Sequence, residues 1–104
     1  MTLQQFNPPH VGALIYRTYI KPYADVSGSM IAKQLGISPS TFNRLLNGKT
    51  SLTSQMAVKL SLVLGGSAES WMRLQESYDL WQVRQYVGTK AFSKIDFAKF
   101  SEGE

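Results

Sequence analysis

The sequence predicts an all-α fold: one domain of five helices followed by a short C-terminal tail. Three observations support this. A chain of 104 residues suffices for one modest core. Apolar residues recur at spacings of three and four in five successive segments. Helix-starting Ser, Thr or Pro residues and helix-ending Gly or Pro residues separate these segments. We divide the chain into a leader (residues 1–7), a helical domain (8–88) and a tail (89–104).

Composition excludes several classes of protein. The chain has no cysteine, and His10 is its one histidine, so we expect no disulfide, no metal site and no cofactor. No apolar run approaches membrane-spanning length, and the first residues lack a signal-peptide pattern. We therefore expect a cytoplasmic protein that does not contact a membrane.

The first helix is expected from about His10 to Ile20. Pro8 and Pro9 give an extended entry, and Pro22 ends the helix because the residue before a proline is disfavoured in helical conformation. Its predicted inward face consists of Val11, Leu14, Ile15 and Tyr19.

The second and third helices are short and joined by a glycine turn. Ser27 is the expected N-cap of the second helix, which runs to Leu35, and Gly36 ends it. Ser38 caps the third helix and Pro39 occupies its first position. The predicted inward residues are Met30, Ile31, Ala32 and Leu35 in the second helix and Phe42, Leu45 and Leu46 in the third.

Two longer helices complete the domain. Thr53 caps the fourth, which extends to about Leu64, and Ser67 caps the fifth, which extends to about Tyr86 before Gly88. The inward stripes are Met56, Ala57, Leu60, Val63 and Leu64 in the fourth and Trp71, Leu74, Tyr78 and Trp81 in the fifth. The tail shows no clear period, and we expect it to be weakly ordered.

Residues 27–50 have the form of a DNA-reading helix-turn-helix, in which the second helix enters the major groove. No Asp or Glu occurs between Val26 and Ala68, which suits a polyanionic partner. Arg44 is the side chain best able to contact guanine, with Ser40 and Thr41 one turn earlier. Asn43, Asn47, Lys49 and Thr50 are expected at phosphate or sugar. The plainer alternative is an ordinary polar surface helix.

Three blocks of sequence resemble the HigA-type (VapI) antitoxins of the Xre-like, lambda-repressor-like helix-turn-helix family. They are residues 7–12 (NPPHVG), residues 31–38 (IAKQLGIS) with 45–49 (LLNGK), and residues 71–75 (WMRLQ) with 78–81 (YDLW). The tryptophan-containing blocks are the most specific, because generic phage-repressor-like domains share the helix-turn-helix but not this tryptophan-rich helix. The resemblance covers about residues 7–81.

The resemblance implies a homodimeric repressor that binds a palindromic operator in double-stranded DNA and neutralises a RelE-like, mRNA-cleaving toxin. Carried over by position, the base-reading residues are Ser38, Pro39, Ser40, Thr41 and Arg44. The backbone-contacting residues are Ser27, Gly28 (through its main-chain amide), Asn47, Lys49 and Thr50.

The fifth helix and the tail carry more aromatic residues than one small core needs. Tyr78, Trp81 and Val83 are therefore candidates for a dimer interface, although aromatic residues at helical spacing are usually core. Phe92, Ile95, Phe97 and Phe100 make the tail a candidate docking segment.

Nothing in the sequence points to catalysis. No Ser/His/Asp set or Gly-rich phosphate loop is present, so we expect no enzyme. Two other functions stay open: an orphan regulator without a toxin, and a toxin-binding module that no longer binds DNA.

Overall fold

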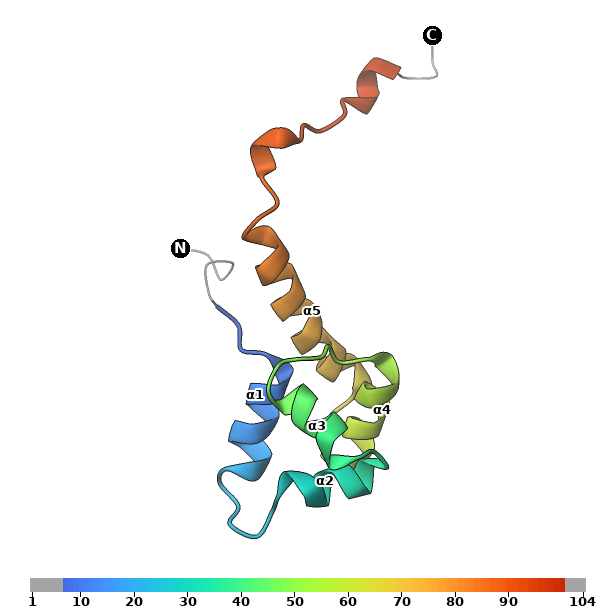
Figure 1. Ribbon diagram of the computed structural model, residues 1–104. Coiled ribbons are helices and arrows are strands. Elements are labelled where there is room, and N and C mark those ends of the chain that lie inside the picture. The colour runs from blue at the N-terminus through green and yellow to red at the C-terminus, as the bar shows by residue number, and fades with distance from the viewer. Residues whose placement is uncertain (1–6, 101–104) are drawn as a thin grey trace.

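The computed structural model describes residues 7–100, and these residues form helices and loops without a strand. The expected all-α fold is confirmed (Figure 1). The elements are α1 (Val11–Ile15), the π-helical turn η2 (Tyr16–Ile20), α2 (Gly28–Leu35), α3 (Pro39–Leu46), α4 (Ser54–Val63), α5 (Ala68–Arg84) and the 3-10 turns η3 (Thr89–Ala91) and η4 (Phe97–Phe100).

The four predicted N-caps are confirmed. Each hydroxyl accepts a hydrogen bond from the amide three residues later, which satisfies a helix N–H that has no intrahelical partner. These bonds are 3.1 Å at Ser27, 3.2 Å at Ser38, 3.2 Å at Thr53 and 3.0 Å at Ser67. The starts of α2 to α5 are therefore fixed by local sequence.

The first helix differs from the expected single α-helix over residues 10–20. His10 is its N-cap, with Nδ1 accepting from the Gly12 amide at 2.9 Å. After Ile15 the helix widens into η2, where the Lys21 amide donates to the Tyr16 carbonyl at 2.8 Å. The wider turn brings the adjacent side chains of Tyr19 and Ile20 against the core.

One hydrophobic core lies between the five helices. Its buried members are Val11, Ile15, Ile31, Ala32, Leu35, Phe42, Leu45, Leu52, Ala57, Leu60 and Trp71. Trp71 also donates from Nε1 to the Gly65 carbonyl at 2.9 Å, which ties the α4–α5 loop to α5. Helix α4 packs on α5, α2 packs on α3 and α4, and α1 packs on α3 and α5.

Two residues expected inside lie at the surface. Met30 is 49% exposed and Leu74 is 37% exposed. On α5 the buried residues are Trp71 and Gln75, which are four positions apart, whereas the sequence predicted Trp71 and Leu74 on the buried face. The buried face of α5 therefore includes Gln75 in place of Leu74. Leu74 instead lines a hollow beside Leu14 and Tyr19.

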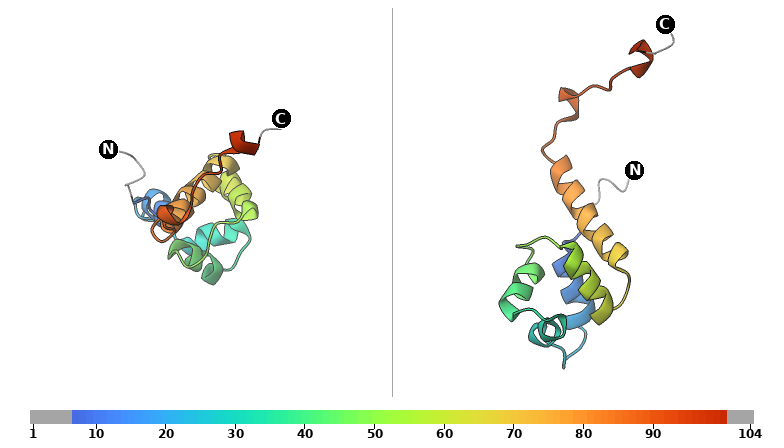
Figure 2. Two further views of the ribbon diagram at one scale, coloured as in Figure 1. Left: turned by 90° about the horizontal axis from the view of Figure 1, so that it is seen from above. Right: turned by 90° about the vertical axis from the view of Figure 1, so that its right-hand side faces the viewer.

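Helix α5 ends at Arg84 rather than at Tyr86. It projects from the body, and the C-terminal tail continues away from it, so that the molecule measures 68 × 29 × 24 Å (Figures 1 and 2). The described part of the tail contains the short turns η3 and η4, and its weak order stays a prediction. The Asp96 carboxylate accepts from the Ala98 amide at 3.1 Å and so caps η4.

The backbone of α1 lies close to the backbone of α3 at Gly12. A Cβ atom at this position would lie 2.0 Å from the Leu45 carbonyl oxygen and 2.7 Å from the Leu46 Cα. Both neighbours are backbone atoms, which cannot rotate away. Glycine is therefore required for α3 to pack directly on α1.

We predict that Gly12→Ala lowers the free energy of unfolding by about 2–3 kcal/mol, because the added methyl group forces α3 away from α1. Urea denaturation measures this. Gly88→Ala is the matched control: a methyl group added there would meet no heavy atom within 4 Å, so the change should stay within about 0.5 kcal/mol. Equal stability of the two variants would show that the α1–α3 approach is not tight.

Candidate nucleic-acid interface

The turn between α2 and α3 has the geometry that the sequence predicts. Gly36 has φ 75°, a left-handed conformation in which glycine carries no side-chain penalty. The Gly36 amide donates to the Lys33 carbonyl at 3.1 Å, and the Ile37 amide donates to the Ala32 carbonyl at 3.0 Å. These bonds close the end of α2 and turn the chain directly into α3.

Helix α3 has one buried and one exposed face. Phe42 is 0% exposed and Leu45 is 4% exposed, and they anchor the helix to the core. The exposed side chains carry hydroxyl, amide and guanidinium groups and no carboxylate. They belong to Ser40, Thr41, Asn43, Arg44 and Asn47.

The predicted base-reading residues at the start of α3 form a small hydroxyl network. Ser38 Oγ donates to Thr41 Oγ1 at 2.8 Å and lies 3.3 Å from Ser40 Oγ. The Ser38 hydroxyl therefore makes hydrogen bonds within the protein both as a donor and as an acceptor. Ser40, Thr41 and the neighbouring Pro39 are exposed at the helix start.

The start of α2 lies beside α3. A Cβ atom at Gly28 would lie 3.5 Å from Leu46 Cδ1 and 3.9 Å from Asn43 Oδ1. The exposed Ser27 and the first amides of α2 thus border the polar face of α3. Amides at a helix start are suited to bind phosphate.

The other border of this face is the loop after α3. Gly48 has φ 73°, and the Lys49 amide donates to the Arg44 carbonyl at 2.8 Å. Lys49 and Thr50 are exposed just beyond this turn. The structure therefore brings all the predicted DNA-contacting residues of α2, α3 and the loop onto one region of the surface, which we call the α3 face.

A residue that the sequence reasoning missed supports this loop. Gln75 on α5 is 4% exposed, and its Oε1 accepts from the Leu52 amide at 2.7 Å. Its Nε2 donates to Asp79 Oδ1 at 2.8 Å. The signal in the sequence was a polar residue four positions after Trp71, on the inward side of α5.

The three residues expected at a dimer interface differ in exposure. Tyr78 packs edge-to-face on His10, with ring centroids 4.9 Å apart, and its hydroxyl accepts from Gln82 Nε2 at 3.1 Å. Trp81 is half-buried, and Val83 is 40% exposed. Leu80, which the sequence reasoning did not name, is 42% exposed beside them.

Residues 7–100 contain no group of three His, Asp or Glu side chains that could hold a metal ion. No helix in this range is long and apolar enough to cross a membrane.

We predict that Gln75→Leu speeds hydrogen exchange of the Leu52 amide and destabilises the domain by about 1–3 kcal/mol, because a buried donor loses its acceptor. Amide exchange measured by NMR tests this. The double variant Gln75→Glu with Asp79→Asn keeps an acceptor for Leu52 and reverses the second bond, so it should restore slow exchange. Slow exchange in Gln75→Leu would contradict the support of the loop by α5.

Comparison with known proteins agrees with this geometry. A helix-turn-helix family model matches residues 24–71. The regulator YddM of Escherichia coli is 33% identical over 89% of this chain and 97% of its own length. Antitoxin HigA-1 of Vibrio cholerae is 31% identical over 91% of this chain and 90% of its own length.

A solved relative shares the fold as well as the sequence. The antitoxin HigA of Pseudomonas aeruginosa, solved with the higBA promoter, is 28% identical with a TM-score of 0.71, over 86% of this chain and 96% of that chain. The resemblance noted in the sequence is thereby confirmed. The chain belongs to the Xre-like helix-turn-helix family of HigA-type antitoxins and the transcriptional regulators related to them.

Proposed function

We propose that this protein is a homodimeric repressor that binds an operator in its own promoter through the α3 face, and that it neutralises a RelE-like toxin. The observation that carries the DNA-binding part is the carboxylate-free polar face of α3, held outward by Phe42 and Leu45. The Pseudomonas relative with its promoter supports this assignment.

The α3 face suggests a division of roles. Arg44 lies on the outer side of α3, where a guanidinium can donate two hydrogen bonds to guanine O6 and N7 in the major groove. Ser40 and Thr41 offer hydroxyls to neighbouring base edges. Because the Ser38 hydroxyl caps the helix, we assign Ser38 mainly to holding Thr41 in place.

Phosphate contacts are proposed at both borders of the α3 face. Ser27 and the Gly28 amide lie at one border, and Lys49 and Thr50 lie at the other. Asn43 and Asn47 are exposed between them. Contacts to the DNA backbone at two separate points fix the angle at which a helix enters the groove, and base contacts then read the sequence.

Dimerisation is proposed through the C-terminal half of α5. Tyr78, Trp81 and Val83, together with Leu80, are aromatic or apolar side chains of this half, and none of them is fully covered within the chain. A two-fold pair of such domains presents two α3 helices to a palindromic site, with half-sites about 34–36 Å apart.

We predict that Arg44→Ala reduces operator preference by about 1–3 kcal/mol at one base pair per half-site, because one bidentate contact is lost. Lys49→Ala should weaken binding to all sequences alike and lower the salt dependence. Fluorescence anisotropy with DNA from upstream of the gene measures both.

Arg73→Ala is the matched control, because Arg73 lies on α5 and outside the residues of the α3 face. It removes one positive charge from an exposed position away from the α3 face. The assignment of Arg44 fails if its variant keeps the operator preference of the wild type, or if Arg73→Ala loses as much.

The toxin assignment is tested by co-expression with the neighbouring gene product. We predict a stable complex on purification and growth arrest when the neighbour is expressed alone. A repressor without such a complex would be an orphan regulator. A complex without operator binding would be a toxin-binding module only.

A further inference from the structure

A hollow lies between α1 and α3, beside the α3 face. It has a volume of about 430 Å³ and is lined by Ala13, Tyr16, Asn43, Leu46 and Asn47. Asn43 and Asn47 also belong to the α3 face, so the hollow continues that surface toward α1. Tyr16 is the first residue of η2, and its side chain is 49% exposed.

The position of Tyr16 beside α3 follows from the contact at Gly12. Gly12 lies against the backbone of α3, where a Cβ atom would be 2.0 Å from the Leu45 carbonyl oxygen. Tyr16 follows Gly12 by four residues, which places it on the same side of the first helix, about 6 Å further along. The phenol ring is therefore held next to α3 by the same backbone contact that orients the α3 face.

The hollow lies on a flank of α3. Asn43 and Asn47 are four residues apart and share this flank, whereas Arg44 is rotated from Asn43 by about 100° around the helix. A helix with its side chains is about 10–12 Å wide and the major groove is about 12 Å wide, so a helix in the groove fills it. The sugar–phosphate backbone then lies along the flanks of the helix. With α3 in the groove, the hollow meets this backbone.

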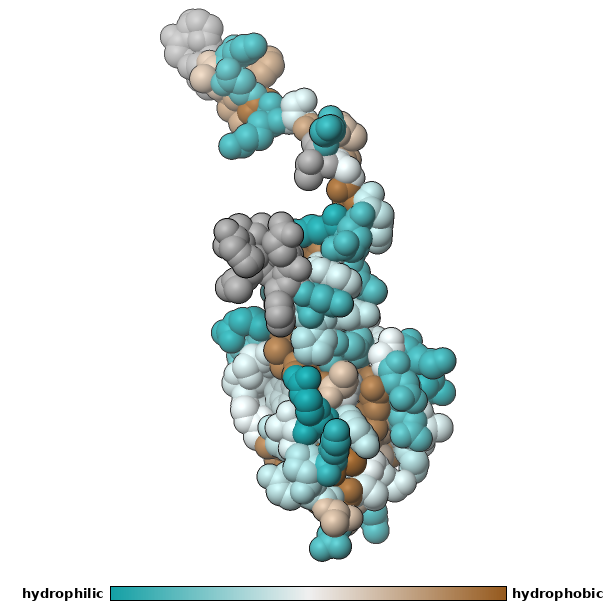
Figure 3. Space-filling view, turned by 90° about the vertical axis from the view of Figure 1, so that its left-hand side faces the viewer, coloured by the Kyte–Doolittle hydropathy of each residue, from teal (hydrophilic) through white to brown (hydrophobic). Residues whose placement is uncertain are grey.

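The hollow has the chemistry that suits a DNA backbone. None of its lining residues is acidic, and Asp25 is the one acid in residues 7–68. Ala13 and Leu46 offer apolar contact to deoxyribose, while the two amides and the phenol can donate hydrogen bonds to phosphate oxygens. Figure 3 views the side of the molecule that α1 forms, where hydrophilic or neutral residues cover most of the body and brown areas are small.

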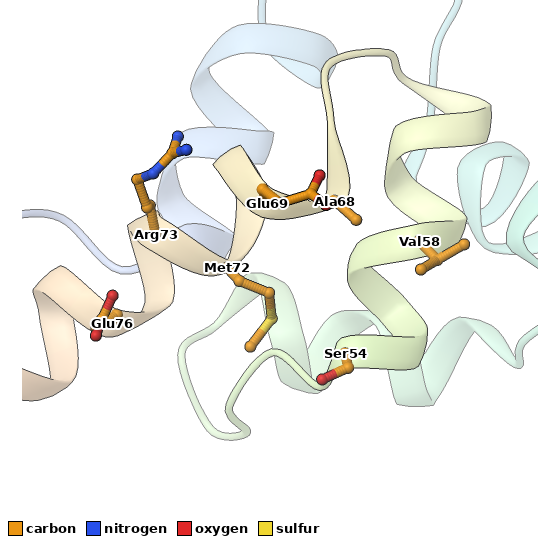
Figure 4. A pocket seen from close by; sticks show the side chains of 7 residues that line it. All are labelled: Ser54, Val58, Ala68, Glu69, Met72, Arg73 and Glu76. Atoms are coloured by element: carbon orange, nitrogen blue, oxygen red, sulfur yellow. The ribbon is translucent and has the colours of Figure 1, made fainter.

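Two other hollows of the body fit DNA less well. The groove between α4 and α5 contains Glu69 and Glu76 against one guanidinium, that of Arg73, and Figure 4 shows both carboxylates on α5. The hollow between α1 and α5 has no charged lining residue and shares none with the α3 face. Of the three, the α1–α3 hollow both borders the α3 face and lacks carboxylates.

We propose that Tyr16 is a further DNA-contacting residue, whose hydroxyl donates to a phosphate of the operator backbone in the hollow between α1 and α3. This inference rests on the proposed function of the α3 face, to which it adds a contact from outside the helix-turn-helix. A phenol hydroxyl is uncharged, so the contact adds affinity for any sequence without adding to the salt dependence.

Tyr16→Phe tests this inference, because it removes the hydroxyl and keeps the ring. We expect the affinity for the upstream operator and for an unrelated duplex to fall alike, by about three- to tenfold for each half-site bound, since one hydrogen bond is lost. The slope of log affinity against log salt should stay that of the wild type, whereas Lys49→Ala should lower it. Fluorescence anisotropy over a range of salt concentrations measures both.

Tyr86→Phe is the matched control. Tyr86 is 76% exposed and lies beyond the end of α5, so the loss of its hydroxyl should leave DNA binding unchanged. An equal loss of affinity in the two variants, or a changed salt slope in Tyr16→Phe, would overturn the inference.

Substituted DNA locates the contact. A methylphosphonate linkage, which replaces one charged oxygen by a methyl group, is placed at each phosphate of the operator in turn. At the phosphate that Tyr16 contacts, the linkage and Tyr16→Phe together should cost less than the product of their separate fold-losses, whereas Tyr86→Phe should give the product everywhere. A general loss of stability in Tyr16→Phe would act alike at every linkage, so it cannot imitate this result.

The outcomes separate the inference from the proposed function. A wild-type protein that does not bind its upstream DNA would overturn both. Wild-type binding that Tyr16→Phe leaves unchanged, or coupling at no linkage, would overturn the inference alone. So would a Tyr16→Phe variant that keeps DNA binding and loses the complex with the neighbouring gene product, because the hollow would then receive a protein.

Discussion

The close approach of α1 and α3 at Gly12 is the constraint on which the rest of the structure depends. With backbone atoms in direct contact, α3 cannot rotate about its axis without losing Phe42 and Leu45 from the core. A helix of eight residues is unstable alone, so this packing, together with the cap at Ser38, maintains it. The polar face of α3 is consequently formed before any partner binds, which lowers the ordering cost of recognition.

Helix α5 supports the same surface from the other side of the core. Gln75 accepts the Leu52 amide and is oriented by Asp79, so the loop that carries Lys49 and Thr50 is fixed to the proposed dimerisation helix. If α5 packs against a second copy as proposed, a change in that packing would act on the loop through these two hydrogen bonds. This gives a physical route by which assembly of the dimer and contact with DNA can influence each other.

Local sequence determined what could be predicted. The caps at Ser27, Ser38, Thr53 and Ser67 and the left-handed Gly36 depend on neighbouring residues only, and all are confirmed. The π-helical turn after Ile15, the exposure of Leu74 and the role of Gln75 depend on packing between distant segments. Most of the α3 face could be predicted as a set because α3 and the loop after it carry it, whereas its border at Ser27 and Gly28 and the support from α5 require the tertiary fold.

The central claim is that the α3 face is the surface that reads DNA. Titration of the isotope-labelled protein with its own upstream DNA, followed by amide NMR signals, tests it most directly. We expect the signals of residues 27–29 and 38–50 to shift first and furthest. Shifts confined to α4 and α5, with the signals of Thr41 and Arg44 unchanged, would contradict it.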